Sequence, residues 1–373
     1  MTAYTKKPKM HRFFLLLLAD LLAAGVLLCI FALFHHVIKK PGNLDNTTLI
    51  PRPTASFSFG WGTPPPSAAE PEATLLIQTS TPSAPVSAEP SLTPSAAAFT
   101  PSAAAFTPSA TPVITPSPAP TPTPAVWTAD SYQSDEISIK IETVVTGAGE
   151  DLVTYYAADI RIANIECIRT AFAHDTYGKN YAQSVLQIGR AHNAILAISG
   201  DSYGLMERGV VVRNGRLYRS EKNASDICVL YYDGTMETLS PGDYEEEALK
   251  EYLISKGAYQ AWCFGPMLLD QDGKALTNFN TSSYLLSKHP RCAIGYYEPG
   301  HYVFLIVDGR QSHSNGLSMR ELALLMEELG CRTAYNLDGG RIALMTFAGQ
   351  VYTKPSNSGR DVSDIIYIGE RNE

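Results

Sequence analysis

A long stretch rich in proline, serine, threonine and alanine limits how much of this chain can pack, because it spans residues 41 to about 130. A seven-residue unit repeats within it, first over residues 94–100 and again over 101–107. Proline fixes φ and removes a backbone donor, so this stretch favours neither helices nor paired strands. We therefore predict a polyproline-rich, disordered linker over residues 38–130 and a single globular domain over residues 131–373.

An almost purely apolar run occupies residues 13–34 and is interrupted only by Asp20. Its length is enough to cross a hydrocarbon core as a helix, so we predict a transmembrane signal anchor over residues 13–37. Residues 1–12 form a basic tail with no acidic residue, which by the positive-inside rule lies in the cytoplasm. A cleaved signal peptide is the alternative, although the run is longer than a usual signal-peptide core.

Net charge and cysteine spacing narrow the class of protein. The formal net charge of -8 argues against a nucleic-acid-binding surface. One cysteine lies in the apolar run, and no two of the other five form a CxxC pair, so a zinc site is not expected. One or two disulfides could form outside the cell, with at least one thiol left over, among Cys167, Cys228, Cys263, Cys292 and Cys331.

The globular region reads as a strand-rich α+β domain with mixed or antiparallel sheets and two or three packed helices. Helices are predicted over residues 181–192, over 245–256 and from Ser318, where Glu321 completes a capping box. The short strands between them do not alternate regularly with helices, so a Rossmann fold and a TIM barrel are excluded. The motifs GxGxxG, Walker A, GxSxG and HExxH are absent from the sequence.

Three predicted strands run into an aspartate beside a glycine, at Asp201, Asp308 and Asp338. A carboxylate at the end of a strand and beside such a turn sits on a rigid element with open space in front of it. A strand that simply ends in a tight turn with a solvated aspartate would leave the same pattern. The stretch from Asn336 to Gly340, which reads Asn-Leu-Asp-Gly-Gly, is the centre of the predicted site.

The order of these segments resembles the phosphodiester glycosidase family, which includes N-acetylglucosamine-1-phosphodiester alpha-N-acetylglucosaminidases. The resemblance covers about residues 193–368 and is carried by 197–201, 209–215, 264–268, 291–295, 308–310, 314–316, 336–340 and the residues Pro355, Ser356 and Arg360. It implies hydrolysis of a sugar 1-phosphodiester. Glycosyl transfer uses carboxylic acids and guanidinium groups bind phosphate, so the expected catalytic residues are Asp338, Asp201 and Asp308. The expected substrate-binding residues are Arg310, Asn336, Gly339, Gly340, Arg341, Arg291, Ser314 and Arg360.

Two segments depart from the family pattern. After Gly340 the family has a small residue or Gln and then Ser or Thr hydroxyls, whereas this chain has Arg341, Ile342, Ala343 and Leu344. Ser199 stands where the family normally has Asn, and Ser202 where an aromatic residue is common. Lost polar contacts lower transition-state stabilisation, so these departures put activity in question but not the fold, and Arg341 could supply a replacement phosphate contact.

The leading hypothesis is a glycoside hydrolase at the cell membrane, with a cytoplasmic N-terminus and an extracellular C-terminal domain. It would act on a glycosyl phosphodiester in a surface glycan, an exopolysaccharide or a cell-wall polymer, and its partners would be that glycan and the membrane, without nucleic acid. The alternatives are a catalytically degenerate member that binds phosphorylated glycans without turnover, and a surface scaffold whose working part is the linker. No cofactor is expected, and although three aspartates could hold Ca²⁺ or Mg²⁺, their spacing matches no EF-hand loop.

Overall fold

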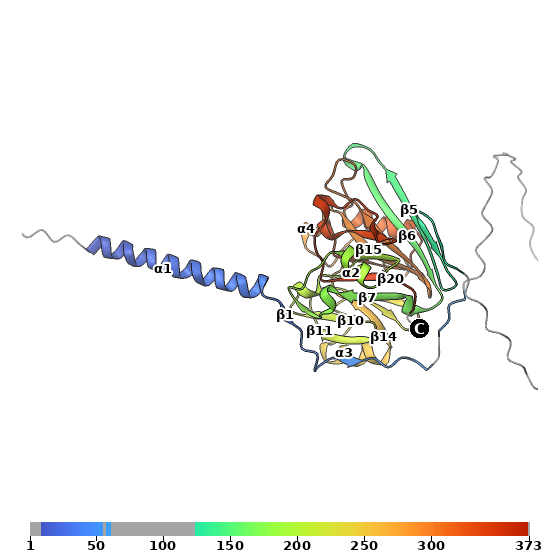
Figure 1. The fold of residues 1–373 in the computed structure, drawn as a ribbon, viewed down its shortest axis with the longest axis horizontal. Coiled ribbons are helices and arrows are strands. Elements are labelled where there is room, and N and C mark those ends of the chain that lie inside the picture. The colour runs from blue at the N-terminus through green and yellow to red at the C-terminus, as the bar shows by residue number, and fades with distance from the viewer. Residues whose placement is uncertain (1–8, 55–56, 61–123, 372–373) are drawn as a thin grey trace, which may run out of the picture. The chain divides into compact units, whose positions relative to one another are not determined.

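The structure is a computed structural model, and it describes residues 9–54, 57–60 and 124–371 (Figure 1). Most of the predicted basic tail and the greater part of the predicted linker, residues 61–123, lie outside the described residues. Among those that are described, helix α1 (Lys9–Ala32) continues into a π-helical turn over Leu33–Val37. Its segment Phe13–Ala32 has a mean hydropathy of 2.7 and is long and apolar enough to cross a membrane, as an anchor or a signal sequence does.

The remaining described elements form an α+β domain built on antiparallel sheets, which confirms the predicted fold class. A seven-stranded sheet has the order β17 (Thr333–Leu337), β15 (Arg291–Glu298), β16 (His301–Val307), β6 (Val153–Ile162), β5 (Ile137–Thr146), β4 (Ser131–Gln133) and β3 (Val126–Trp127). A six-stranded sheet has the order β13 (Met236–Leu239), β12 (Ile227–Tyr231), β14 (Ala258–Trp262), β10 (Gly209–Arg213), β11 (Arg216–Glu221) and β2 (Thr48–Leu49).

A five-stranded sheet and a short two-stranded sheet complete the strand pairing. The five-stranded sheet has the order β19 (Gln350–Val351), β18 (Met345–Phe347), β9 (Leu196–Ser199), β20 (Asp364–Ile368) and β7 (Ile168–Phe172). The short sheet pairs β1 (Lys40–Pro41) with β8 (Gly178–Lys179). The dipeptide Asn214-Gly215, which in a sequence predicts a two-residue β-hairpin turn, joins β10 to β11 in such a hairpin.

Four helices belong to the domain among the described residues: α2 (Val185–Ala191), α3 (Glu246–Ser255), α4 (Ser283–Leu286) and α5 (Met319–Glu328). The capping box of α5 forms as predicted, with Ser318 and Glu321 each bonding the other's backbone nitrogen. Helix α2 is shorter than the predicted 181–192 because the Ser184 side chain accepts from the Gln187 nitrogen and starts the helix there.

Strand β16 shows how the centre of the seven-stranded sheet is buried on both faces. Its alternate residues Tyr302, Phe304 and Ile306 join a core that also takes side chains from the other two large sheets. The intervening Val303, Leu305 and Val307 pack under α5. Successive strand residues point to opposite faces, so an unbroken apolar run is what a strand covered on both sides requires.

The cysteines do not form the disulfides that the sequence left open. All six are free thiols, and the five within the domain are buried.

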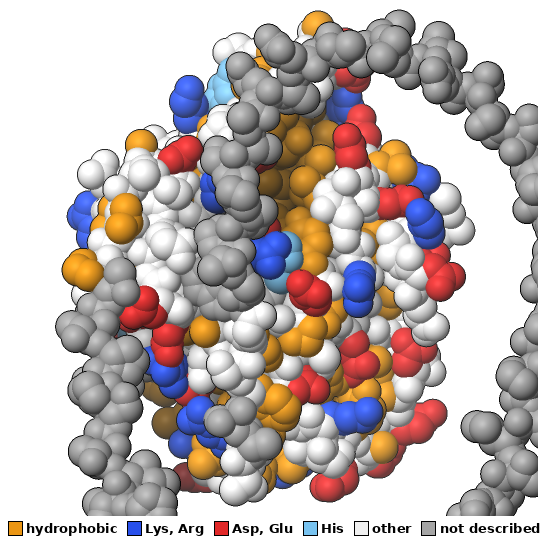
Figure 2. Space-filling model, turned by 90° about the vertical axis from the view of Figure 1, so that its right-hand side faces the viewer, with side chains coloured by type: hydrophobic (Ala, Val, Ile, Leu, Met, Phe, Trp, Pro, Cys, Tyr) orange, Lys and Arg blue, Asp and Glu red, His pale blue; other side chains and the backbone are white. Residues whose placement is uncertain are grey.

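Charged side chains of both signs are interspersed over the face shown in Figure 2, where apolar side chains gather in a hollow.

Segments at both ends of the predicted linker, residues 38–130, pack on the domain. The packed domain therefore includes residues that lie before the predicted start at residue 131. Strand β1 pairs with β8, β2 extends the edge of the six-stranded sheet, and Ile50 is fully buried in the main core. On the far side of the Pro-rich stretch, β3 pairs with β4 and Trp127 packs against Tyr132. The apolar and β-branched residues of β2 and β3 favour strand pairing in spite of the surrounding composition.

We expect Ile50→Ala to lower the free energy of unfolding of the domain by about 2–5 kcal/mol, because it leaves a cavity in the core. The matched control is Leu49→Ala, since Leu49 is 65% exposed and points away from the core. Thermal unfolding followed by circular dichroism measures both variants. Equal melting temperatures for the two variants would show that this segment is not packed on the domain.

Candidate functional site

The topology of the seven-stranded sheet brings two of the three aspartate junctions to one edge. Strand β15 lies between β16 and β17 and is antiparallel to both, so β16 and β17 run in the same direction and end at the same edge of the sheet, with the start of β15 between them. Asp308 directly follows β16 and Asp338 directly follows β17. Arg291, the first residue of β15, pairs with Val307 and therefore lies at the same edge.

A cavity of about 230 Å³ opens at the end of β17. Eight of the residues predicted from the sequence line it: Asp338, Arg310, Asn336, Gly339, Gly340, Arg341, Arg291 and Arg360. Four arginines and a single acidic residue therefore line the cavity in the part of the chain that the structure describes. Guanidinium groups bind phosphate oxygens in a bidentate manner, so the charge balance favours an anionic ligand.

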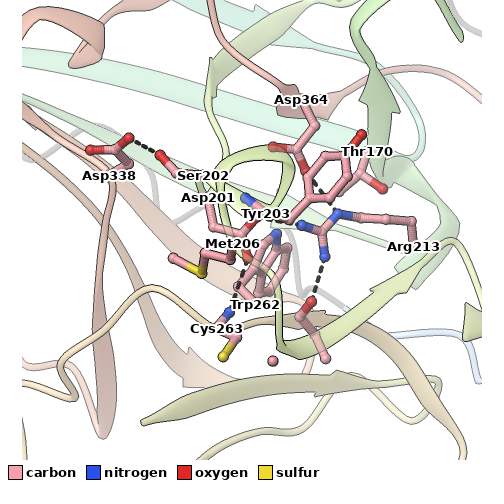
Figure 3. Close-up of polar contacts among 12 residues, drawn as sticks. Thr170, Asp201, Ser202, Tyr203, Met206, Arg213, Trp262, Cys263, Asp338 and Asp364 are labelled. Atoms are coloured by element: carbon pink, nitrogen blue, oxygen red, sulfur yellow. Dashed lines mark hydrogen bonds and ion pairs between the residues drawn. The ribbon is translucent and has the colours of Figure 1, made fainter. Parts of the chain in front are cut away.

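Asp338 is the ionisable acid of this cavity, and its side chain is 15% exposed. Its Oδ2 accepts a hydrogen bond from the Ser202 hydroxyl (Figure 3). The same oxygen lies 3.9 Å from Arg360 Nη2. Burial raises the pKa of the Asp338 carboxyl above its ordinary value. A carboxyl group whose pKa is raised toward the working pH is better suited to exchange a proton during a reaction.

Arg310 is held in the cavity by residues that sequence reasoning missed. Its Nη2 donates to the Tyr284 hydroxyl at 3.1 Å and to His289 Nδ1 at 2.9 Å. His289 Nε2 lies 2.8 Å from the Tyr284 carbonyl oxygen, which can only accept, so Nε2 carries the proton and Nδ1 accepts from Arg310. Burial and the two nearby guanidinium groups lower the pKa of His289, which keeps this ring neutral.

Arg291 and Asn336 form part of the cavity wall. The Arg291 guanidinium donates to the carbonyl oxygens of Leu317, Leu285 and Ser287 at 2.7–2.8 Å, so it fixes the loop that carries Tyr284 and His289. Burial, with the charge of Arg310, lowers the pKa of Arg291 to about 10. Asn336 Nδ2 donates to the Gly265 carbonyl at 2.8 Å, while its buried Oδ1 has no hydrogen-bond partner among the described residues.

The two glycines after Asp338 allow the chain to pass close to its neighbours. A Cβ atom on Gly339 would lie 2.6 Å from the Pro290 carbonyl oxygen, which is too close for any side chain. Gly340 has a φ of 65° and donates its N–H to the same carbonyl at 2.9 Å. The paired glycines therefore let the cavity floor lie against the start of β15.

Asp201 lies outside the cavity lining, in a buried cluster with Arg213 and Asp364 (Figure 3). Its Oδ1 is 2.8 Å from Arg213 Nη2, and its Oδ2 accepts from the Cys263 nitrogen at 2.9 Å. Arg213 Nε donates to Asp364 Oδ2 at 2.8 Å. The Arg213 guanidinium therefore forms ion pairs with two buried carboxyl groups. Burial raises the pKa of Asp364. Asp201 is nevertheless near enough to Asp338 for its charge to help raise the pKa of the Asp338 carboxyl.

Asp308 and Ser314 also lie outside the cavity lining. Asp308 Oδ2 accepts from the Tyr156 hydroxyl and lies 3.0 Å from His313 Nε2. The Ser314 hydroxyl donates to the Asp308 carbonyl oxygen at 2.6 Å, which ties the loop after β16 back on itself. The three aspartates thus have separate partners and do not form one cation site in the described chain.

The apolar departures after Gly340 point into the protein interior. Ile342, Ala343 and Leu344 are at most 9% exposed, and none of the three lines the cavity. Arg341 does line it and donates to the Gly359 carbonyl at 3.3 Å. The change from hydroxyl to apolar side chains at these positions therefore alters core packing and leaves the polar groups of the cavity in place.

We expect Arg213→Met to lower the free energy of unfolding by about 3–5 kcal/mol, because it leaves two buried carboxyl groups without their cation. Arg216→Met is the matched control, since Arg216 lies on the next strand and is exposed. Chemical denaturation measures both. A variant at Arg213 as stable as the control would show that the buried cluster does not hold the sheets together.

Comparison with known proteins connects this geometry to a family. Residues 192–369 match the family model described as phosphodiester glycosidase. A prophage-derived uncharacterised protein of Bacillus subtilis, YomE, is 31% identical over 199 residues, which cover 52% of this chain. The chain spans only 30% of that relative's length.

The fold is also found in a solved structure. The catalytic domain of the zebrafish N-acetylglucosamine-1-phosphodiester alpha-N-acetylglucosaminidase, auto-inhibited by its pro-peptide, matches with a TM-score of 0.51 and 18% identity. The match covers 64% of this chain and 85% of the zebrafish domain. Residues 192–369 therefore form a region that matches the phosphodiester glycosidase family.

Proposed function

We propose that this protein is a membrane-anchored, extracellular phosphodiester glycosidase that hydrolyses a sugar 1-phosphodiester in a surface glycan or wall polymer. The observation that carries the proposal is the cavity at the end of β17, where one carboxyl group of raised pKa and four arginines line the same space among the described residues. A substrate with a sugar ring and a phosphate diester needs both kinds of group.

In the proposed reaction water adds to the anomeric carbon, and the bond from this carbon to the phosphate oxygen breaks. The products are the free sugar and a phosphate monoester. The Asp338 carboxylate would take the proton from the attacking water, a role for which its raised pKa is suited. Arg310, held by Tyr284 and His289, would bind the phosphate oxygens.

A single carboxyl group in the cavity is compatible with this substrate. Most glycosidases use a second carboxylic acid to protonate the leaving oxygen. A departing phosphate monoester carries its negative charge stably, and preorganised cations can stabilise that charge without a proton transfer. In the proposed mechanism the guanidinium groups therefore take the place of the second acid, and Asp201 and Asp308 have structural roles.

The second candidate is a family member that binds phosphorylated glycans without turnover. Its motivation was the loss of hydroxyl groups after Gly340, and the buried positions of Ile342, Ala343 and Leu344 remove most of that motivation. Ser202 favours this alternative, because its hydroxyl donates to Asp338 Oδ2 and competes with water for that oxygen. The two candidates differ in whether product is released.

The proposed location rests on the apolar segment of α1 and on the charges around it. Four cationic residues precede the segment within residues 1–12, and no acidic residue does. Under the positive-inside rule this places the N-terminus in the cytoplasm and the domain outside. The surface glycans and wall polymers of the proposal lie on that outer side.

We expect Asp338→Asn to reduce hydrolysis at least ~100-fold, since proton transfer by a positioned side chain contributes about 10²–10⁴ in rate. The full chain in detergent is incubated with a panel of sugar 1-phosphodiesters, including one of N-acetylglucosamine, and released reducing sugar is measured. Asp361→Asn is the matched control, because Asp361 is exposed and lies outside the cavity lining.

Binding of the sugar 1-phosphodiester, measured beside the release of sugar, distinguishes the two candidate functions. Release by the wild type and the control, with binding but no release by Asp338→Asn, supports the enzyme. Binding without release by all three proteins supports the second candidate. Equal release by Asp338→Asn and the wild type contradicts the role of this carboxyl group.

A further inference from the structure

The chain is fixed to the domain directly after the apolar helix. The Ile38 carbonyl accepts from Asn180 Nδ2 at 2.9 Å, and the Gly42 nitrogen donates to the Tyr177 carbonyl at 2.8 Å. Strand pairing of β1 with β8 lies between these two contacts. The helical turn Leu33–Val37 alone separates the apolar segment from these contacts, and at ~1.5 Å per residue it spans about 8 Å.

A second cavity, of about 480 Å³, lies between residues 40–46 and the domain. Its volume falls within the range of small-molecule sites. Among the described residues, it is lined by one carboxylate, Glu221, and by four cationic side chains: Lys40, Lys179, Arg219 and Lys250. This excess of positive charge is local, since the protein as a whole has a formal net charge of -8. The cavity shares no lining residue with the one that contains Asp338.

These cations differ in how free they are to contact a ligand. The Arg219 guanidinium donates to the carbonyl oxygens of Gly209, Met206 and Tyr203 at 3.1, 2.7 and 3.5 Å, and no carboxylate partner neutralises its charge in the described chain. Lys40 and Lys250 are exposed, and neither forms an ion pair with a described residue. Lys179 is paired with Glu207. An anion in the cavity would thus meet cations that are mostly not neutralised.

Aromatic rings and amides complete the lining. Tyr177 stacks on Tyr203 with ring centroids 5.5 Å apart, and the Tyr218 ring lies 4.8 Å from Tyr177. Asn43 and Asn46 add amide groups from the segment that follows the helix. Rings that combine an apolar body with a polar tip are typical of sites at the boundary between membrane and water.

We propose that this second cavity binds the phosphate-bearing headgroup of an anionic membrane lipid in the leaflet that faces the domain. The argument rests on the membrane insertion of Phe13–Ala32 in the proposed function, because only an inserted helix places the cavity beside the bilayer. The lipid phosphate meets Lys40, Arg219 and Lys250, and the headgroup lies against the tyrosine rings. Headgroup binding fixes the orientation of the domain on the membrane.

The test uses the full chain in neutral detergent and measures its thermal unfolding with added short-chain lipid. The probes are phosphatidylglycerol, phosphatidylcholine and inorganic phosphate. The test variant is the double substitution Lys40→Gln, Lys250→Gln. Its charge-matched control is Lys140→Gln, Lys256→Gln, at exposed lysines that do not line the cavity.

We expect phosphatidylglycerol to raise the melting temperature of the wild type and the control. The test variant should need roughly 10- to 30-fold more lipid for the same shift, as the loss of two lysines near an anionic lipid predicts. Phosphatidylcholine and inorganic phosphate should have little effect. Equal responses of the test variant and the control, or an equal effect of phosphatidylcholine, would overturn the proposal. An equal effect of inorganic phosphate would show that the cavity binds phosphate alone and would overturn the lipid headgroup as its ligand.

The same variants separate this proposal from the proposed function. The Lys40, Lys250 double variant should hydrolyse a soluble sugar 1-phosphodiester at the wild-type rate, because neither lysine lines the cavity of Asp338. Loss of the lipid effect with intact hydrolysis would support both proposals. Hydrolysis without any lipid effect in the wild type would remove the headgroup site alone.

Discussion

The buried guanidinium of Arg213 is the interaction on which the geometry of the site depends. It comes from the six-stranded sheet and binds two carboxyl groups of the five-stranded sheet region, those of Asp201 and Asp364. Ser202 follows Asp201 directly and donates to Asp338, which ends a strand of the seven-stranded sheet. The ion cluster around Arg213 therefore joins the six-stranded and five-stranded sheets. It also positions Ser202, whose hydroxyl contacts Asp338 at the end of the seven-stranded sheet.

Asp201, Asp308 and Asp338 follow strands in the same way in the sequence, but the structure gives them different surroundings. Asp201 is fully occupied by hydrogen bonds, and Asp308 is held by Tyr156 and His313. Asp338 alone of the three lines the cavity. Because burial raises its pKa and four arginines surround the same space, this is the place where proton transfer and phosphate binding can occur together.

The sequence predicted the fold class, the capping box at Ser318, the hairpin at Asn214-Gly215 and most residues of the cavity, since these depend on local patterns. It missed the partners that come from distant parts of the chain. Nothing near Arg213 shows that it would be buried between two carboxyl groups, and no spacing links His289 to Arg310. The burial of Ile50 in the core was not predicted, because the surrounding sequence has the composition of a linker. Short strands that add to the edge of a sheet leave little periodic signal.

The central claim is that the cavity at Asp338 binds the phosphate of a sugar through Arg310. The most direct test is calorimetric titration of the full chain in detergent with a sugar 1-phosphate, comparing Arg310→Gln with Arg190→Gln. Arg190 is exposed and lies outside the cavity lining, so it controls for loss of charge. Binding at least ~10-fold weaker for Arg310→Gln than for the control is predicted, since a charge-assisted hydrogen bond contributes about 1.5–3 kcal/mol. Equal affinity of the two variants would contradict the account.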